Sequence, residues 1–238
     1  MPGVGQNLRD HPKVYVTWGI KAGYLTDTPP ARGGVMLRCT AAGSDWRNDI
    51  SINMGAFVTE RIPWSDIKGI EQGGAHARHR RNEMMIALLL PAGSGELRLL
   101  SPDPQVQPLL DYNYLADPFD RQRLRAGVRL ALALVEYDDL QAGLGPRLAP
   151  TAADLASDAA LDEWLQREVT TYSHISGTCR MGPGADDMAV VDQYGKVHGL
   201  EGLRIVDASI MPNLVRAPIN PTVLMIGERI AALIHQGK

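Results

Sequence analysis

The chain has 238 residues, of which 45% are hydrophobic and 21% are charged, as is typical of a globular protein with one large domain or two smaller ones. Its formal net charge of −3 gives no electrostatic support for binding nucleic acid or an anionic membrane. The one basic cluster, HARHRR at 76–81, is typical of a solvated loop.

No apolar run reaches the ~18 residues that a membrane span needs, and no signal peptide opens the chain. Cys39 and Cys179 lie far apart and show no metal-ligand spacing, so we expect reduced thiols in a cytoplasmic protein. The histidines and acidic residues show no recognised ligand spacing either, so no metal site is expected.

The first half of the chain carries the alternation of extended strands. After a turn-rich opening, residues 13–21 (KVYVTWGIK) alternate between apolar and polar side chains, which predicts a half-buried strand. Its apolar face consists of Val14, Val16, Trp18 and Ile20. Further strands are expected at 33–40, 48–58, 82–91 and 95–100. The polar stretch at 59–82 lacks a clear period and predicts a lid-like or poorly ordered loop.

Helical patterns follow. Asp117 is placed to cap a helix that begins at Pro118. Its apolar positions repeat at helical spacing: Leu124, Val128, Leu132 and Val135. A second helix is expected within 155–169, where one side carries Leu161, Trp164 and Leu165. Strands that precede helices in this way favour an α+β fold.

The end of the chain predicts one more strand and a buried helix. Residues 203–209 (LRIVDAS) are typical of a compact buried strand. Asn220 is a candidate N-cap for a helix whose first residue is Pro221. Because this helix is apolar nearly all round, we expect it to be buried.

His174 stands in an unusual loop, TTYSHISGTCRMG at 170–182. Its neighbours are small hydroxyl residues and glycine, which suggests a backbone shaped to bring the imidazole close to another group. Histidine suits proton transfer because its unperturbed pKa is near ~6.5. The alternative is a loop histidine that hydrogen-bonds the backbone, and the loop alone favours neither.

Five segments taken together resemble a known family. They are PGVGQNLRDH at 2–11, GELRLLSPDPQVQPLLDYNYLADPFD at 95–120, HISGTCRMG at 174–182, VVDQYGKVHGLEGLRIVDASIMP at 190–212 and NPTVLMIGERIAALI at 220–234. Their sequence and order are similar to the C-terminal half of the glucose–methanol–choline (GMC) oxidoreductases, FAD-dependent enzymes that oxidise alcohols. The resemblance covers nearly the whole chain. The Gly-x-Gly-x-x-Gly turn of the family's N-terminal part has no counterpart here.

The resemblance implies an α+β fold: a mostly antiparallel sheet with flanking helices as the substrate domain, plus a C-terminal strand and helix that complete an FAD-binding α/β domain. Residues 1–12 would form a motif loop near the FAD, 13–202 the substrate-binding and catalytic domain, and 203–238 a return segment to the FAD domain. Asn7 and Asp10 match a family motif near the cofactor, without an assigned role.

The same resemblance implies two catalytic residues. His174 would lie against the reactive face of the flavin and take the hydroxyl proton while the α-hydrogen leaves towards flavin N5. Asn220 matches the family's second polar residue, which is His or Asn and orients the substrate oxygen. The alternative for Asn220 is simple N-capping of the helix.

Five residues are expected at the cofactor. Asp207 and Ala208 would lie beside the ribityl and pyrophosphate region, although Asp207 could instead cap the turn after its strand. The helix that starts at Pro221 would direct its positive N-terminus at the flavin N1–C2=O edge. Since proline has no N–H, Thr222 and Val223 are the expected donors. A plain core helix is compatible with this role.

The leading interpretation is therefore FAD-dependent oxidation of a primary alcohol to an aldehyde, with an N-terminal FAD-binding half as a partner. One alternative is a lyase on the same fold, and another is a truncated chain without catalysis. Four tryptophans could help to cage a quaternary ammonium, but nothing groups them in the sequence: Trp18, Trp46, Trp64 and Trp164. Four histidines are expected at the surface: His76, His79, His198 and His235.

Overall fold

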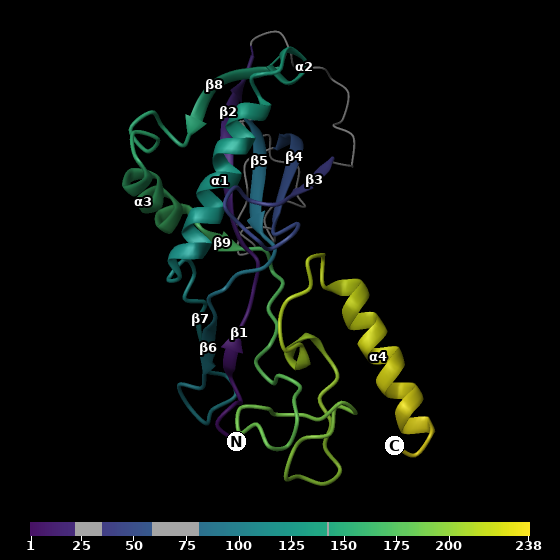
Figure 1. Ribbon diagram of the computed structural model, residues 1–238. Coiled ribbons are helices and arrows are strands. Elements are labelled where there is room, and N and C mark those ends of the chain that lie inside the picture. Colours follow the sequence, from purple (N-terminus) through teal and green to yellow (C-terminus); the bar gives the residue numbers. More distant parts are fainter. Residues whose placement is uncertain (22–34, 59–80, 142) are drawn as a thin grey trace, which may run out of the picture.

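The computed structural model describes residues 1–21, 35–58, 81–141 and 143–238 (Figure 1). The strands are β1 (Gln6–Leu8), β2 (Pro12–Ile20), β3 (Met36–Cys39), β4 (Ile50–Val58), β5 (Arg81–Leu88), β6 (Gly95–Arg98), β7 (Leu109–Asp111), β8 (Leu144–Ala149) and β9 (Thr170–Thr171). The helices are α1 (Pro118–Leu134), α2 (Asp138–Gln141), α3 (Asp158–Glu168) and α4 (Asn220–His235), with a 3₁₀ turn at Ala208–Ile210. The strands pair antiparallel in two sheets, one ordered β3-β4-β5-β2-β8 with β9 on β2, the other β1-β6-β7. The predicted α+β class is confirmed.

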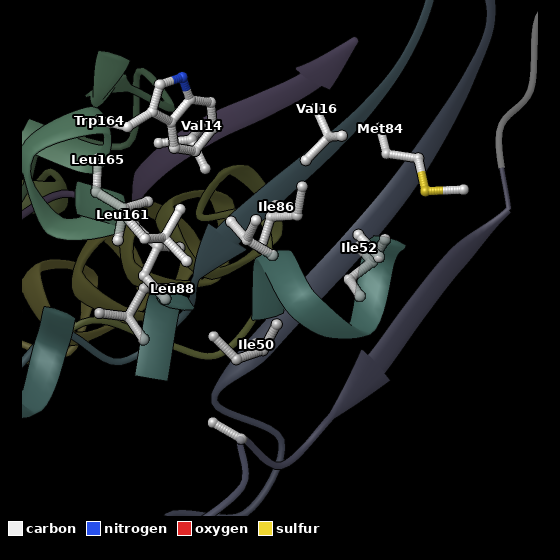
Figure 2. Close-up of a cluster of buried hydrophobic side chains, with 14 of the residues drawn as sticks. Val14, Val16, Ile50, Ile52, Met84, Ile86, Leu88, Leu161, Trp164 and Leu165 are labelled. Carbon is white, nitrogen blue, oxygen red and sulfur yellow. The ribbon is translucent and has the colours of Figure 1, made fainter. Parts of the chain in front are cut away.

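The core lies between the large sheet and the helices α1 and α3. The predicted apolar face of β2 is confirmed for Val14, Val16 and Trp18, which are buried, whereas Ile20 is half-buried and Thr17 on the opposite face is buried as well. Figure 2 shows side chains of β2, β4 and β5 gathered with those of α3 in one cluster. Helix α1 lies so close to the sheet that a Cβ at Gly127 would stand 2.8 Å from the Ile86 side chain. This packing fixes the central strand β5, which pairs with β2.

Helix α1 begins as its sequence predicts. The Asp117 carboxylate accepts a hydrogen bond from the N–H of Phe119 at 2.8 Å, with Pro118 as the first helical residue. Helix α3 begins at a similar cap, where the Ser157 hydroxyl accepts from the N–H of Ala160. Both helices therefore satisfy part of their N-terminal donors with a side chain.

A fully buried arginine ties α1 to the loop before β6. Arg123 donates to Asp49 at 3.2 Å and to Asp120 at 2.5 Å. Asp120 in turn accepts the N–H groups of Ala92 and Gly93. Buried charges are stable only when they are paired and hydrogen-bonded. Here both aspartates that pair with Arg123 also accept hydrogen bonds from backbone N–H groups. The loop at 91–93 is thereby fixed, and Arg9 donates to its carbonyl groups.

The small sheet was not fully predicted. β1 lies inside the opening segment, whose turn residues favour a loop. Gly5 makes the strand possible: its φ is +82°, and a Cβ there would lie 2.3 Å from the carbonyl oxygen of Leu97. Only glycine combines this backbone conformation with so close an approach. The opening loop thus pairs with β6 instead of remaining separate.

The strand expected at 203–209 is not formed. This segment makes an isolated bridge between Lys196 and Arg204 and then the 3₁₀ turn. No strand among the described residues lies beside it to continue a sheet, so its apolar pattern has no ladder to join. A strand needs a partner as well as a pattern.

The expectation that α4 is buried is wrong for the chain as described. Leu224 is 63% exposed, Met225 56% and Ile234 50%, while Ile230 and Leu233 are buried. Figure 1 shows α4 at the side of the molecule, away from the helices that cover the large sheet. Within the described ranges, no helix is long and apolar enough to cross a membrane. Most of the loop expected at 59–82, with Trp64, His76 and His79, lies outside the described residues.

Candidate active site

Two histidines from distant parts of the chain meet at the start of β2. The Nδ1 atoms of His11 and His174 lie 2.9 Å apart, and the two rings are almost perpendicular at 86°. The backbone brings them together: Arg9 and Ser176 exchange two N–H to carbonyl hydrogen bonds of 2.9 Å each. The segment before β2 and the loop after β9 are thus held side by side at this point.

Asp10 fixes both histidines through their backbone. One oxygen of its buried carboxylate accepts the N–H of His11 at 2.7 Å and that of His174 at 2.9 Å. The other oxygen accepts the hydroxyl groups of Tyr114, at 2.6 Å, and Thr171. Four donors compensate the buried charge. Asp10 therefore positions the histidine pair.

His174 lies against an aromatic ring. The imidazole stacks on Tyr172, with ring centres 4.5 Å apart and an angle of 29°. Between them Ser173 has a φ of +65°, and its N–H donates to the Thr171 hydroxyl. Asn53 on β4 donates to the Tyr172 hydroxyl at 3.2 Å. A left-handed backbone at a non-glycine residue is uncommon, and here it turns the loop so that the imidazole covers the tyrosine.

The two imidazoles differ in environment. Burial, and then the proximity of His174, lower the pKa of His11 to about 4, so His11 is neutral at neutral pH. His174 is half-buried, and burial is also the main cause that lowers its pKa. The Asp10 carboxylate opposes this shift, while the Lys13 ammonium reinforces it. A neutral, partly accessible imidazole can accept a proton.

Gly177, in the same loop as His174, lets the opening segment of the chain approach closely. Gly177 has a φ of +86°, and a Cβ there would lie 2.5 Å from the carbonyl oxygen of Asn7. The Asn7 amide donates to the carbonyl groups of Gly177 and Pro212. The N–H of Gly177 donates to the Ala208 carbonyl. The opening segment, the histidine loop and the C-terminal segment therefore meet around Asn7, although they are far apart in the sequence.

The start of α4 differs from the sequence prediction. The N-cap residue is Ile219 in a helical conformation, and no side chain caps the helix, so the expectation that Asn220 is the N-cap is wrong. Among the described residues, no group accepts from the N–H of Thr222 or pairs with the exposed Asn220 amide. The N–H of Val223 donates to the Ile219 carbonyl at 2.9 Å, so this donor already has an acceptor within the helix, and its expected contact with a cofactor stays a prediction.

Asp207 makes the local contacts of a cap. Its carboxylate accepts the N–H and the hydroxyl of Ser209 and begins the 3₁₀ turn. A cofactor contact of Asp207, Ala208, Pro221 or Thr222 stays a prediction. The Nε2 atom of His11 lies 3.1 Å from the carbonyl oxygen of Val215. This contact joins the histidine pair to the segment that leads into α4.

Sequence reasoning missed His11, Tyr114 and Tyr172. The first of these stands directly after Asp10 in the opening motif, which was the available signal. His198 is half-buried and contacts the Gly182 carbonyl through Nε2, and His235 is exposed as expected. Cys39 and Cys179 are free thiols. In the described part of the chain, no group of three His, Cys, Asp or Glu side chains could hold a metal ion.

Comparison with known proteins identifies the family. The family model "GMC oxidoreductase" matches residues 91–227. The chain is 33% identical over 251 aligned positions to the oxygen-dependent choline dehydrogenase of Paraburkholderia xenovorans, covering 99% of this chain and 44% of that protein. It is 32% identical to the oxygen-dependent choline dehydrogenase of Klebsiella pneumoniae, and that match covers 99% of this chain and 44% of the relative. The chain thus spans less than half the length of these relatives.

Solved structures share the fold. Pyridoxine 4-oxidase from Mesorbium loti superposes with a TM-score of 0.78 at 27% identity, covering 99% of this chain and 44% of that one. A formate oxidase from Aspergillus oryzae gives a TM-score of 0.79 at 22% identity, with coverage of 99% and 48%. With the antiparallel sheet and the histidine loop in place, the chain belongs to the GMC oxidoreductase family.

Proposed function

We propose that this chain forms the substrate-binding and catalytic portion of an FAD-dependent enzyme that oxidises a primary alcohol to an aldehyde, with His174 as the base. One observation carries the proposal: the half-buried imidazole of His174 has a lowered pKa and is held in place through Asp10. Such a group accepts a proton at neutral pH.

The relatives support this reaction class. The similar proteins are named choline dehydrogenase and pyridoxine 4-oxidase, and the formate oxidase is a protein whose FAD is modified. These descriptions apply to those proteins. They support an oxidoreductase acting on a small molecule here, because the match to the choline dehydrogenases covers 99% of this chain.

The residues present fit one part of FAD. The first turn of α4 has no side-chain cap, so its N–H groups and dipole are available to a partly negative edge of a ring system. Thr222 is the donor we assign to that edge. The pyrophosphate, in contrast, needs a glycine-rich turn that leads from a strand into a helix, and Gly3 and Gly5 lead into β1 instead.

An N-terminal half would supply the remaining cofactor contacts. We infer that it covers the exposed apolar side of α4, which includes Leu224 and Met225. Patches of this kind mark interaction surfaces. On this proposal, residues 203–238 belong with the FAD domain, and residues 13–202 form the substrate domain. The segment at 203–209, which makes only an isolated bridge among the described residues, would gain a neighbouring strand in the same way.

In this proposal, three residues of the chain have separate roles. The substrate hydroxyl lies against His174, which takes its proton, while the Asn220 amide orients the substrate oxygen. Bound FAD would supply the acceptor for the hydride. Asp10 keeps the imidazole at a fixed position, which avoids the loss of rate that comes with a misplaced catalytic group.

The surroundings of Tyr172 favour a neutral alcohol over a quaternary ammonium substrate. An ammonium ligand is recognised by stacking on aromatic faces. Tyr172 is the ring in contact with His174, and the Lys13 ammonium already lies 4.8 Å from its centre. A second cation beside Lys13 would be repelled.

Anaerobic bleaching tests the proposed function. The FAD-loaded protein, with an N-terminal half present, is mixed without oxygen with a neutral primary alcohol or with choline. We expect the visible flavin absorbance to fall, and to fall faster with the neutral alcohol. A substrate that is consumed without bleaching would indicate lyase chemistry instead, and failure to react with any alcohol would contradict the proposal.

A further inference from the structure

We infer that His11 is a positioning residue that fixes the tautomer of His174, so that Nδ1 of His174 carries the proton and Nε2 carries the lone pair. The catalytic consequence of this inference rests on the proposed function. The tautomer itself does not, because it follows from the hydrogen bonds around His11.

The side of the His11 ring that faces away from His174 contacts a backbone carbonyl group. Its Nε2 lies 3.1 Å from the carbonyl oxygen of Val215. A carbonyl oxygen can only accept a hydrogen bond, so this nitrogen must carry a proton. The Leu89 carbonyl is a second acceptor that acts on the His11 ring. The contact to Val215 is the one that joins Nε2 to a carbonyl oxygen at hydrogen-bond distance, and it places the proton on that nitrogen.

His11 is uncharged in its buried position. The side chain is fully buried, and burial disfavours the charged form of an imidazole. A neutral imidazole has one donor and one acceptor. With Nε2 as the donor, Nδ1 of His11 is the acceptor. The lowered pKa of His11, about 4, agrees with this assignment.

The proton between the rings then belongs to His174. Two unprotonated nitrogens do not form a hydrogen bond, and the Nδ1 atoms are 2.9 Å apart. His174 therefore donates from Nδ1, and its Nε2 is left as the basic nitrogen. The nitrogen that is protonated in a histidine is set by the bond that the other makes. Here a chain from the Val215 carbonyl through His11 sets it.

The geometry has little freedom to change. The backbone N–H groups of both histidines bind the same oxygen of Asp10, so the two backbone segments cannot separate without breaking that contact, and the His11 ring is fully buried between its partners. When Nε2 of His174 takes a proton, the resulting cation keeps its Nδ1–H bond to the neutral His11. No proton has to pass to the buried ring.

Two substitutions of His11 separate its hydrogen-bonding role from its packing role. In His11→Asn, the side-chain oxygen can reach the position of Nδ1 and accept from His174. In His11→Gln, the amide reaches towards Val215, in the position of Nε2, and the acceptor for His174 is lost. Both variants are neutral and polar, so each serves as the control for the other.

The first measurement needs no turnover. In FAD-loaded protein with the N-terminal half present and ring-labelled with ¹⁵N-histidine, NMR above neutral pH reports the state of each ring nitrogen. We expect a protonated signal for Nδ1 of His174 and an unprotonated one for Nε2, with assignments checked in His174→Ala. A His174 that carries its proton on Nε2 would overturn the inference.

The variants then test which group fixes the tautomer. We expect His11→Asn to keep the Nδ1–H form of His174 and most of the turnover. We expect His11→Gln to shift the population towards the Nε2–H form and to lower kcat by roughly 10-fold or more, as a misplaced tautomer does in other enzymes, with KM and FAD content little changed. An unchanged tautomer in FAD-loaded His11→Gln would contradict the role of His11. If the unsubstituted protein shows the Nδ1–H tautomer of His174 but the His174→Ala variant turns over at the normal rate, only the proposed function is contradicted.

Discussion

The ammonium group of Lys13 lies 4.8 Å from the centre of the Tyr172 ring, and the same ring stacks on His174. This places a positive charge close enough to the imidazole to lower its pKa, in addition to the larger effect of burial. Asp10 acts in the opposite direction. The charged and titratable groups around this part of the site include Lys13, Asp10, Tyr172 and the neutral His11, and the Arg38 guanidinium also acts on Tyr172.

Removal of the Lys13 charge should shift the pH dependence of turnover. His174 acts as a base only when it is neutral, so kcat/KM falls as the pH drops through its pKa. Because Lys13 lowers that pKa, Lys13→Gln should raise it and move the acid limb to higher pH. Lys196→Gln is the control, since that lysine lies 5.6 Å from the Tyr194 ring, a matched pair of lysine and tyrosine.

High salt should shift the acid limb of the unsubstituted protein in the same direction, because salt screens partly exposed charges. The pH profile is measured with an alcohol that does not titrate in this range. An acid limb that stays in place or moves to lower pH in Lys13→Gln would show that Lys13 does not act on His174.

Asn220 should matter for turnover and not for stability. The side chain makes no cap bond, so Asn220→Ala should leave the free energy of unfolding nearly unchanged. Asp117→Ala is the control, because that residue does cap its helix and its loss should cost about 1 kcal/mol. If the amide orients the substrate, Asn220→Ala and Asn220→Asp should both lower kcat by roughly 10²-fold.

Urea unfolding and turnover are measured on the same preparations. An Asn220→Asp variant with full activity, together with a destabilised Asn220→Ala, would mean that Asn220 only supports the helix.

The hydrogen bond from Tyr114 to Asp10 should contribute measurably to stability. Burial, and then the contact with Asp10, raise the pKa of Tyr114, so it remains a donor at every working pH. Tyr114→Phe removes one of the four donors to the buried carboxylate and should cost about 2 kcal/mol. Tyr137→Phe is the control, since that side chain is 70% exposed. Equal unfolding midpoints for the two variants would contradict this account of Asp10.

The 238-residue chain should not retain FAD when it is produced without an N-terminal half. The first turn of α4 is the part that we assign to the flavin, but the described residues contain no glycine-rich turn that leads from a strand into a helix for the pyrophosphate, and the apolar side of α4 is exposed. We expect a colourless protein after addition of FAD and a yellow one after co-expression with an N-terminal half from a related enzyme. Leu224→Lys should prevent that assembly, whereas Arg229→Lys, at an exposed position of the same helix, should not. A yellow, active protein from the chain alone would contradict the proposal of a partner half.

The parts of the fold that depend on local physics could be predicted from the sequence. The apolar face of β2, the Asp117 cap of α1 and the apolar side of α3 each follow from residues close together in the chain. The start of α4 was misplaced by one residue because Ile219 adopts a helical conformation, which residue preferences do not reveal.

Other features depend on what lies next to a segment. The apolar runs at 203–209 and in α4 predict burial, but a sequence pattern does not say whether a neighbour is present to cover them. The pair of His11 and His174 spans 163 positions and is made by tertiary contacts, so no spacing rule could indicate it. The family resemblance indicated His174, and only the structure assigned its partner.

The central claim is that His174 is the base, and the rate of anaerobic flavin bleaching by a primary alcohol tests it most directly. In FAD-loaded protein with both halves present, His174→Ala should slow bleaching by roughly 10²-fold or more while FAD content stays near normal. His235→Ala, at the exposed end of α4, should bleach at the original rate. A folded, FAD-loaded His174→Ala variant that bleaches as fast as the original protein would contradict the account.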